Sequence, residues 1–426
     1  MAVAQQVSHV FPLGSRINEA GRLEVGGCDL VELAREVGTP AYVVAEDDLR
    51  ARARSFLAAF AAHGADVDVH FAAKAFPCTA VLALFAQEGL ACDVAGRGEL
   101  EAALRAGFDP ARIHVHGNAK TQDELRRALQ AGVGHVVLDN ADEIDRLERL
   151  VGAGTRQRVQ MRIAPGVSPD THPSISTGGP NTKFGFSLAD APAAIARVQA
   201  SEAFELEGLH FHIGSQILDL RPFRAALQAI APLGRFGVVN LGGGLGVAYT
   251  RDDDPPSIED YAAEKVRLVQ EILGEPAPRI LDEPGRALVA NGCVTLYTVQ
   301  SVKRNVATWV AVDGGMADNL RPMLYGARYE AHVADRMAAR DGLTRAHVTG
   351  RHCESGDVIV RDADLADPCV GDVIVTPATG AYGHAMANTY NGSPRPPVVF
   401  VRDGDARVVV RRESYDDLFA RDAADG

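Results

Sequence analysis

Lys74 is the first residue of the chain whose position suggests chemistry. It follows the apolar run 67–73, which has the composition of a β-strand. A lysine amine flanked by Ala73 and Ala75 can lose its proton more easily than a fully hydrated one, and it can then form a Schiff base with a carbonyl. Most lysines at strand ends are ordinary surface residues, so Lys74 alone does not establish a site.

Three consecutive glycines form a second candidate. Gly242, Gly243 and Gly244 follow the apolar run 236–241, and glycine lets backbone N–H groups come close to a phosphate. No Lys-Ser/Thr pair follows them and no G-x-G-x-x-G pattern occurs here, which excludes a Walker-type nucleotide loop. A tight turn is the simpler explanation, but the pattern favours a phosphate site.

Polar side chains follow two further strand candidates. Glu283 and Arg286 come directly after the run 279–282, and His212 and Ser215 come after the run 206–211. An imidazole can stack on a planar ring and a hydroxyl can bind phosphate. The alternatives are a structural ion pair and core histidines, including His210 two residues earlier.

The last third of the chain carries a further set. Cys353 and Glu354 precede a glycine turn that ends at Asp357, and Arg321 and Tyr325 stand upstream of them. A thiol, a carboxylate and a guanidinium could act together on a substrate. A buried cysteine and a surface arginine are the ordinary explanations.

The elements that must position these residues alternate between short β-rich runs and longer helical runs, which is typical of βα units. Parallel strands of such units carry their active sites at the carboxyl ends. Eight strand candidates predict a closed (β/α)8 barrel: 67–73, 91–94, 113–116, 135–138, 158–163, 206–211, 236–241 and 279–282.

After residue 286 the periodicity changes to two, for example in 294–302, 309–312, 358–360 and 373–376, and this indicates a mainly antiparallel β domain. We therefore expect an N-terminal segment at 1–40 that joins the β domain, a barrel at 41–290 and the β domain at 291–426.

Local patterns make smaller predictions. Thr121 and Glu124 predict a capping box, and Ser187 predicts the cap of the alanine-rich helix after it. The stretch 164–186 is rich in Pro, Ser, Thr and Gly and is longer than an ordinary connection, so we expect a lid or substrate loop there.

Composition narrows the function classes. The chain has 426 residues and a formal net charge of -13, which disfavours nucleic-acid binding, so an anionic cofactor needs a local cluster of cations. Six cysteines without C-x-x-C spacing indicate neither a disulfide framework nor a metal site. No leader pattern and no long apolar run occurs, and we expect a cytoplasmic protein with no membrane association.

The motifs appear in an order that resembles one family. The matching segments are Phe71 to Ala75, Gly117 to Lys120, Thr171-His172, Lys183 to Gly185, His212 to Gln216, Gly242 to Gly244, Glu283 to Arg286, Asp313 to Met316, Arg321 to Tyr325, Cys353 to Asp357, Gly380 to Tyr382 and Tyr390-Asn391. Together they resemble the diaminopimelate decarboxylases, which bind pyridoxal 5'-phosphate on an alanine-racemase-like barrel with a β domain. Phe76, Ala164 and Gly96-Arg97 depart from the usual family residues, which leaves fine specificity open.

The resemblance implies a role for each candidate. Lys74 would hold the cofactor covalently, Glu283 would pair with its ring nitrogen, and Cys353 would return a proton to the α-carbon. The remaining cofactor-binding positions would be His212, Ser215, Gly242, Gly243, Gly244, Gly285, Arg286 and Tyr382. Those that bind substrate would be Arg286, Arg321, Tyr325, Glu354 and Tyr382.

These roles imply that the chain converts meso-2,6-diaminopimelate to L-lysine and CO2, the last step of lysine biosynthesis. Ornithine has no distal carboxylate and would leave the arginines unpaired, at a cost of roughly 1 to 3 kcal/mol. The alternatives are a decarboxylase of the same fold for another amino acid, a non-catalytic cofactor-binding homologue and a racemase. Glu283 disfavours the racemase, because related racemases place an arginine against the ring nitrogen.

The resemblance also implies a quaternary structure. In relatives the segment corresponding to Cys353 to Asp357 reaches the active site of the neighbouring subunit. We therefore expect a homodimer with two shared active sites.

Overall fold

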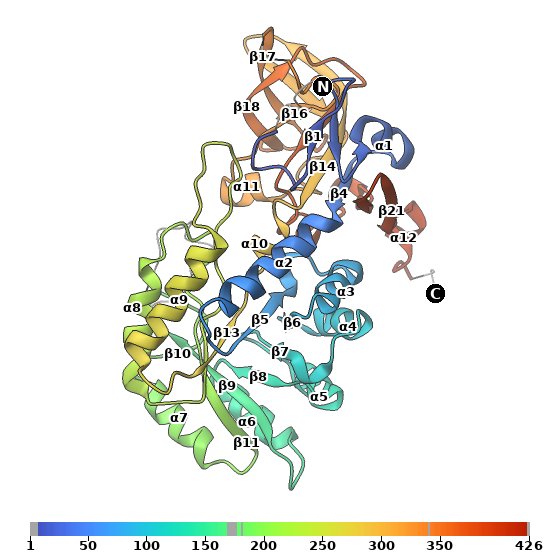
Figure 1. Ribbon diagram of the computed structural model, residues 1–426. Coiled ribbons are helices and arrows are strands. Elements are labelled where there is room, and N and C mark those ends of the chain that lie inside the picture. Colours follow the sequence, from blue (N-terminus) through green and yellow to red (C-terminus); the bar gives the residue numbers. More distant parts are fainter. Residues whose placement is uncertain (1–6, 168–176, 180–181, 340, 424–426) are drawn as a thin grey trace. The chain divides into compact units, whose positions relative to one another are not determined.

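The strands predicted from the alternating pattern form a closed parallel barrel (Figure 1). The computed structural model describes residues 7–167, 177–179, 182–339 and 341–423. Within them the barrel strands are β5 (Val67–Ala72), β6 (Ala91–Val94), β7 (Ile113–Val115), β8 (His135–Leu138), β9 (Gln157–Ala164), β11 (Phe204–His210), β12 (Val238–Asn240) and β13 (Arg279–Asp282). Because β13 pairs with β5 and β8 pairs with β9, the sheet closes on itself. All eight predicted strands are confirmed, and β6, β8 and β13 have the predicted bounds.

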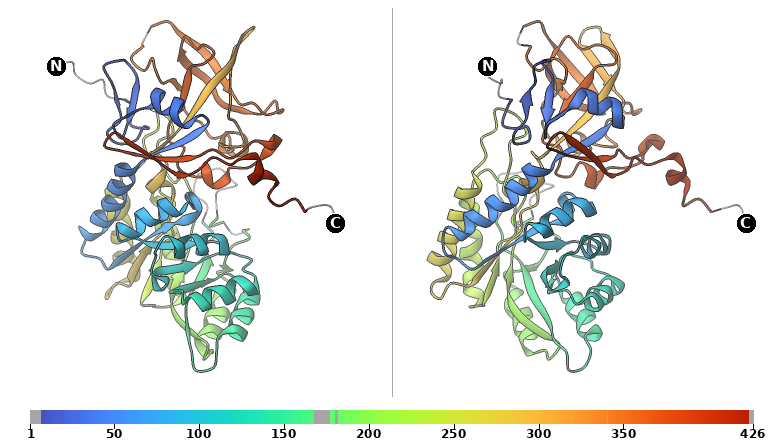
Figure 2. Two further views of the ribbon diagram at one scale, coloured as in Figure 1. Left: turned by 90° about the vertical axis from the view of Figure 1, so that its right-hand side faces the viewer. Right: turned by 45° about the vertical axis from the view of Figure 1, so that its right-hand side comes forward.

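Helices connect these strands along the outside of the barrel, coloured from cyan to yellow in Figure 2. They are α3 (Thr79–Gln87), α4 (Arg97–Arg105), α5 (Gln122–Ala131), α6 (Ala141–Leu150), α7 (Ala191–Ala200), α8 (Arg221–Ile230) and α9 (Ile258–Leu273). A short strand, β10 (Phe186–Ser187), pairs with β9 before α7 begins.

One predicted helix cap is confirmed and one is wrong. Thr121 and Glu124 form the capping box of α5. Ser187 does not cap α7, because that helix begins at Ala191 with Asp190 as its N-cap. Pro192 stands in the first turn, where proline favours a helix start. The hydroxyl of Ser187 instead accepts a hydrogen bond from the N–H of Asp190 at 3.1 Å.

The chain divides into two compact units. Residues 52–247 and 255–288 form the barrel unit, and residues 1–51, 248–254 and 289–426 form the sheet unit. α2 (Glu46–Ala61) and α10 (Arg286–Val289) cross the division.

A mixed sheet forms the centre of the sheet unit. Its strands follow the order β18 (Val358–Ala366), β17 (Leu343–Thr349), β15 (Thr308–Val312), β14 (Cys293–Arg304), β4 (Ala41–Ala45), β20 (Val398–Arg402) and β21 (Asp405–Val410). β19 (Val373–Thr376) pairs with β14 and with β16 (His332–Val333). Most pairs are antiparallel, as predicted, but β15 pairs with β17 and β4 pairs with β20 in parallel.

The N-terminal segment packs on this sheet. It forms β1 (Arg16–Ile17), β2 (Leu23–Val25), β3 (Cys28–Asp29) and α1 (Leu30–Val37). Leu23 and Leu30 belong to one buried apolar cluster with Val294 of β14 and Val399 of β20. The N–H of Leu23 also donates to the carbonyl of Ala334 at 2.8 Å. Apolar burial and backbone pairing thus attach this segment to the sheet.

Three further observations bear on predictions made from the sequence. In the described part, no helix has the length and apolar character that a membrane span requires. All six cysteines are unpaired. The predicted Thr171-His172 motif and much of the predicted lid, residues 168–176 and 180–181, lie outside the described residues.

Candidate active site

Lys74 lies where the sequence predicted it, immediately after the first barrel strand. β5 ends at Ala72, and a single 3-10 turn over Ala73–Ala75 carries the lysine. Its side chain is 43% exposed, and its Nζ lies 3.9 Å from Oδ2 of the buried Asp93 on β6. An accessible amine therefore stands at the carboxyl end of the strands, with a carboxylate beside it.

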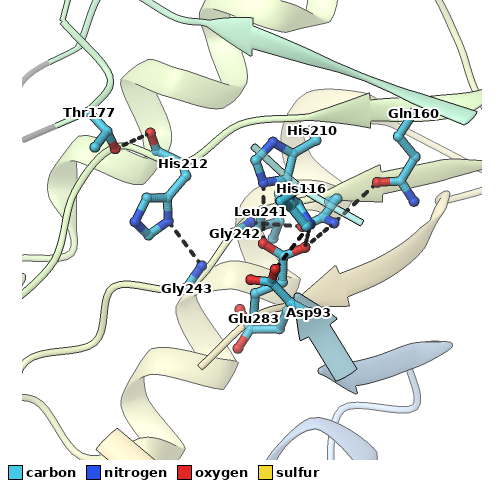
Figure 3. A network of polar contacts seen from close by, with 12 residues as sticks. Asp93, His116, Gln160, Thr177, His210, His212, Leu241, Gly242, Gly243 and Glu283 are labelled. Carbon is cyan, nitrogen blue, oxygen red and sulfur yellow. Dashed lines mark hydrogen bonds and ion pairs between the residues drawn. The ribbon is translucent and has the colours of Figure 1, made fainter. Parts of the chain in front are cut away.

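Glu283 is the centre of a buried polar network at the same end of the barrel (Figure 3). Its Oε1 lies 2.9 Å from Nε2 of His116 and accepts a hydrogen bond from Nδ2 of Asn240 at 2.6 Å. Its Oε2 lies 3.2 Å from Nε2 of His210. Burial raises the pKa of Glu283, but the two imidazoles outweigh it and hold that pKa well below the usual range.

The neighbours of Glu283 titrate differently. Burial lowers the pKa of His210 to about 3, although Glu283 opposes this shift, so His210 is neutral at physiological pH. Burial also raises the pKa of Asp93, against the opposing effects of His116 and Lys74. The site thus holds an ionised carboxylate away from water, which can bind a protonated ring nitrogen or a cation. The ligand atoms of His116, His210 and Glu283 lie within 4.8 Å of one another, a spacing at which they could together hold a metal ion.

The triple glycine is required by the crowding of three loops. A Cβ added at Gly242 would lie 2.6 Å from the carbonyl oxygen of Phe211, and one at Gly244 would lie 2.5 Å from that of Gly214. At Gly243 it would lie 1.9 Å from the carbonyl oxygen of Glu283. Gly242 and Gly244 also have φ values of +56° and +117°, which favour glycine.

Two of these glycine N–H groups have partners inside the protein. Gly242 donates to Oδ1 of Asn240 at 3.0 Å, and Gly243 donates to Nδ1 of His212 at 3.3 Å. No acceptor for the N–H of Gly244 is found among the described residues. Among the described residues, the N–H of Gly244 is therefore the one of the three that has no acceptor within the protein.

His212 presents a flat, neutral ring beside this loop. Because its Nδ1 accepts from Gly243, the proton of the neutral ring is assigned to Nε2. Burial lowers the pKa of His212 well below the usual range, and the positive Lys74 and Arg162 add to that shift.

The guanidinium of Arg286 is hydrogen-bonded to the hydroxyl of Ser215. Nε and Nη2 of Arg286 donate to Oγ of Ser215 at 3.2 and 3.0 Å. A Cβ added at the adjacent Gly285 would lie 3.1 Å from Cβ of Ala72 and 3.2 Å from that of Ala75, so this loop passes directly beside the residues that flank Lys74. The guanidinium supplies the local positive charge that an anionic cofactor would require in a chain of net charge -13.

Sequence reasoning missed several members of the network. His116, Asp93, Asn240 and Arg162 were not selected as site residues, although each lies at or near the carboxyl end of a barrel strand. That position was the available signal, and His116 also directly precedes the Gly117 to Lys120 motif.

The sheet unit brings together a second group of predicted residues. The N–H of Cys353 donates to Oδ1 of Asn391 at 3.2 Å, and the carboxylate of Glu354 accepts from the hydroxyl of Tyr390 at 2.6 Å. Cys353 and Glu354 are both exposed. Two motifs far apart in the sequence therefore form one surface cluster.

Asp357 anchors the turn that carries this cluster. Its Oδ2 accepts from the N–H of His352 at 2.9 Å, and its Oδ1 accepts from that of Met316 at 2.8 Å. The Cys353 to Asp357 turn is thereby attached to the Asp313 to Met316 motif.

Arg321 is buried, whereas a surface arginine was the simple expectation from sequence. It begins α11 (Arg321–Tyr325), and its guanidinium carbon lies 4.3 Å from the ring centroid of Tyr249 and 5.4 Å from that of Tyr329. Its Nη1 donates to the hydroxyl of Tyr329. Burial lowers the pKa of Arg321, but the two tyrosines outweigh this and raise it. Among the described residues its Nε has no acceptor.

Tyr325 and Tyr382 also lie in the sheet unit and are partly buried. Tyr325 ends α11, and Tyr382 has a φ of +61°, which is uncommon for a bulky residue.

Comparison with known proteins gives this arrangement a family. The model of the pyridoxal-dependent decarboxylases, pyridoxal binding domain, matches residues 46–290. Diaminopimelate decarboxylase of Mycobacterium tuberculosis is 43% identical over 438 residues, which cover 97% of this chain and 97% of that protein. The Bacillus subtilis enzyme of the same name is 44% identical and covers 96% and 97%.

The chain belongs to the diaminopimelate decarboxylase family. Solved structures of the family agree with the fold. The diaminopimelate decarboxylase of M. jannaschii, in co-complex with L-lysine, has a TM-score of 0.90 and 33% identity, and it covers 96% of this chain and 98% of its own. The Helicobacter pylori protein, complexed with L-lysine, has a TM-score of 0.86 and 31% identity, with 92% and 98% covered.

Membership of the diaminopimelate decarboxylase family makes pyridoxal phosphate the cofactor, and the barrel unit fits it. Glu283 offers a buried ionised carboxylate for the ring nitrogen. Arg286, Ser215 and the N–H of Gly244 offer donors for the phosphate. Lys74 offers an accessible amine. Each charged part of the cofactor thus has a complementary group at the carboxyl ends of the strands.

Proposed function

We propose that this chain removes CO2 from the α-carbon of one end of meso-2,6-diaminopimelate and releases L-lysine. The observation that carries the proposal is the buried, ionised Glu283 between His116 and His210 at the end of the barrel that bears Lys74. When bound, pyridoxal phosphate supplies the electron sink for the electron pair that remains on the α-carbon after CO2 leaves.

Glu283 would hold a proton on the ring nitrogen of the cofactor. An ionised carboxylate in a site of low dielectric favours the protonated form of a neighbouring nitrogen. His116 and His210 support this role because they keep the carboxylate ionised and oriented. A protonated ring nitrogen strengthens the sink and therefore favours decarboxylation over racemisation.

Lys74 would hold the cofactor through its Nζ until the amine of the substrate displaces it. Its partly exposed side chain supports this role, because the substrate amine must be able to reach the same position. Asp93, with Oδ2 at 3.9 Å from Nζ, would keep the lysine end oriented between turnovers.

The phosphate would bind to Arg286, Ser215 and the backbone of Gly244. Gly242, Gly243 and Gly285 would serve by leaving room, since a Cβ at any of them would meet a neighbouring atom within 3.2 Å. The flat neutral ring of His212 would lie against the ring of the cofactor. A neutral imidazole there adds no charge that competes with Glu283 for the ring proton.

The sheet unit would supply the proton donor and the groups that recognise substrate. Cys353 would donate a proton to the α-carbon, because a thiol S–H can act as a general acid. The distal carboxylate of the substrate would bind Arg321, Arg286 and Tyr325, and the distal ammonium would bind Glu354. Tyr382 would complete the site over the cofactor and substrate.

We further propose that two copies of the chain form a dimer in which the Cys353 to Asp357 turn of each subunit completes the site of the other. The exposure of Cys353 and Glu354 supports this, because both groups can reach a ligand outside their own sheet unit. We place the protein in the cytoplasm, where scattered unpaired cysteines are typical.

The deciding experiment measures CO2 and L-lysine formation by the cofactor-loaded protein from meso-diaminopimelate, with ornithine, lysine and arginine in parallel. We expect CO2 release from meso-diaminopimelate alone, with one L-lysine formed per CO2. Release from another amino acid would contradict the proposed substrate. No release from any of them would contradict the proposed reaction and would favour a cofactor-binding protein without catalysis.

A further inference from the structure

A second buried lysine lies behind the glycine loop. Lys265 on α9 is 1% exposed, and its Nζ contacts the carboxylate of Asp282, the last residue of β13. It also donates to the hydroxyl of Tyr261, one helical turn earlier, and that hydroxyl donates to Oδ1 of Asp282 at 3.0 Å. All three side chains are buried in the barrel unit, so a cation, a carboxylate and a phenol form one closed group.

The same ammonium is attached to the glycine loop. Nζ of Lys265 donates to the carbonyl oxygen of Gly242 at 3.0 Å and approaches that of Leu241 at 3.4 Å. It also lies 4.4 Å from the ring centroid of Phe223 on α8. The aromatic ring and the two carbonyls together restrict where the ammonium can be.

One carbonyl joins this group to Glu283. The oxygen of Gly242 that accepts from Lys265 also accepts from the N–H of Glu283 at 3.1 Å. Asp282 directly precedes Glu283 in the chain. The carbonyl of Gly242 is therefore held by both the ammonium of Lys265 and the backbone of Glu283. Loss of Lys265 would loosen the glycine loop, while His116, His210 and Asn240 still hold the side chain of Glu283.

We propose that Lys265 and Asp282 are a positioning pair that holds the Gly242 to Gly244 loop in the conformation that binds the cofactor phosphate. The inference rests on the proposed function, because it concerns the same phosphate site. Both side chains are buried, so they would act on the cofactor only indirectly. They act through the backbone of the Gly242 to Gly244 loop. Within that loop, the N–H of Gly244 is the one that has no partner among the described residues.

Stability alone does not explain a lysine at this position. Burying two charges costs desolvation energy, and well-packed apolar residues often replace a buried ion pair without loss of stability. An apolar pair cannot donate hydrogen bonds to the carbonyls of Leu241 and Gly242. Alignment of the loop is therefore the property that the ion pair supplies and an apolar pair does not.

The test compares cofactor binding by the unchanged protein and by the double variant Lys265→Met with Asp282→Leu. Removing both partners leaves no unpaired buried charge. Each apo protein is titrated with pyridoxal phosphate and, separately, with pyridoxal, which lacks the phosphate. We expect the dissociation constant for pyridoxal phosphate to rise about ten-fold, the effect of one lost hydrogen bond, and that for pyridoxal to stay within about two-fold.

A matched control removes another ion pair of the same helix. Arg224 on α8 and Glu271 on α9 form an ion pair at 2.6 Å, and their side chains are 36% and 46% exposed. The double variant Arg224→Gln with Glu271→Gln should bind both ligands as the unchanged protein does. A selective loss in this control would contradict the assignment to Lys265 and Asp282.

Three outcomes would overturn the inference. The first is unchanged binding of pyridoxal phosphate by the Lys265→Met, Asp282→Leu protein, and the second is an equal loss for both ligands. If that variant does not fold, Tyr261→Phe serves instead, because it removes only the bridging hydroxyl. In Tyr261→Phe we expect the affinity for pyridoxal phosphate to fall about two-fold to three-fold while the affinity for pyridoxal is unchanged. The third refuting outcome is the absence of this selective loss. If the unchanged chain fails to bind pyridoxal phosphate, the proposed function is refuted instead.

Discussion

Oε1 of Glu283 lies 2.9 Å from Nε2 of His116, and both side chains are buried in the barrel unit. The two residues are far apart in the sequence and come from different strand ends, β13 and β7. Their contact makes Glu283 a stronger acid than an isolated buried glutamate, and the first two predictions depend on it.

Glu283→Gln should keep the fold and remove the charge that we propose holds a proton on the ring nitrogen. We expect CO2 release to fall about 100-fold to 1000-fold, the range found when a preorganised electrostatic group is removed. The assay is CO2 release at saturating substrate and cofactor. Glu205→Gln, on the exposed side of β11, is the control and should be unaffected. Equal activity of the Glu283→Gln and Glu205→Gln proteins would refute the assigned role.

His116→Gln should shift the pH dependence of activity. The histidine lowers the pKa of Glu283, so its removal should let that pKa rise toward the usual range. The acid limb of the activity profile should then move to higher pH. The measurement is kcat as a function of pH for both proteins, and superimposable acid limbs would contradict the expectation.

Stability should decrease as the pH falls below about 6.5, the usual histidine pKa in an unfolded chain. Burial lowers the pKa of His70 to about 4, that of His210 to about 3 and that of His384 to about 4. Below 6.5 the unfolded chain binds protons that the folded chain does not, which costs about 1.4 kcal/mol per pH unit for each group. The free energy of unfolding, measured with urea between pH 7 and pH 5, tests this slope.

Asp318 opposes that trend. Burial raises the pKa of Asp318 to about 7, so between about pH 4 and pH 7 the unfolded chain has released a proton that the folded chain retains. The contribution of Asp318 to the free energy of unfolding therefore decreases by about 1.4 kcal/mol for each unit by which the pH rises in this range. The three histidines outweigh this one aspartate, so these four groups together contribute a loss of stability on acidification.

His70→Phe should isolate one contribution to this slope. Neither ring nitrogen of His70 has a hydrogen-bond partner among the described residues, although Nε2 lies 3.7 Å from Oδ2 of Asp68. The ring lies 4.1 Å from that of His114, so an aromatic apolar ring suits the site. The slope between pH 6 and pH 5 should decrease by about 1.4 kcal/mol per unit. His63→Asn, at an exposed position, should leave the slope unchanged. Identical slopes for the His70→Phe and unchanged proteins would be inconsistent with a neutral His70.

Arg321→Ala should reduce the use of meso-diaminopimelate far more than cofactor binding. Loss of two charge-assisted hydrogen bonds to the distal carboxylate should lower kcat/KM about 100-fold. The dissociation constant for pyridoxal phosphate should not change, because the phosphate site lies in the barrel unit. Arg328→Ala, an exposed neighbour, is the control. Equal kcat/KM for the two variants would exclude Arg321 from substrate binding.

Mixing two inactive variants should restore activity if subunits share sites. A Lys74→Ala subunit retains Cys353, and a Cys353→Ala subunit retains Lys74, so a mixed dimer has one intact site. Random exchange gives about one quarter of the activity of the unchanged protein, because half of the dimers are mixed and each has one intact site of two. Activity that stays at the level of the separate variants after subunit exchange would refute shared sites.

The sequence by itself determined the elements of the barrel and the position of Lys74. Strands show runs of apolar residues and helices show a longer period, and these are local patterns that do not depend on closure of the sheet. The same holds for the capping box of α5, whose two side chains are three residues apart. The family resemblance likewise depended on short motifs, each readable within a few residues.

Only the tertiary structure decided which side chains meet. Glu283 contacts His116 and His210 because β13, β7 and β11 end at the same side of a closed barrel, and no local pattern reports that closure. The burial of Lys265 beside Asp282 has the same cause as the network of Glu283. Contacts between distant segments depend on how the chain packs, and packing is a property of the whole unit.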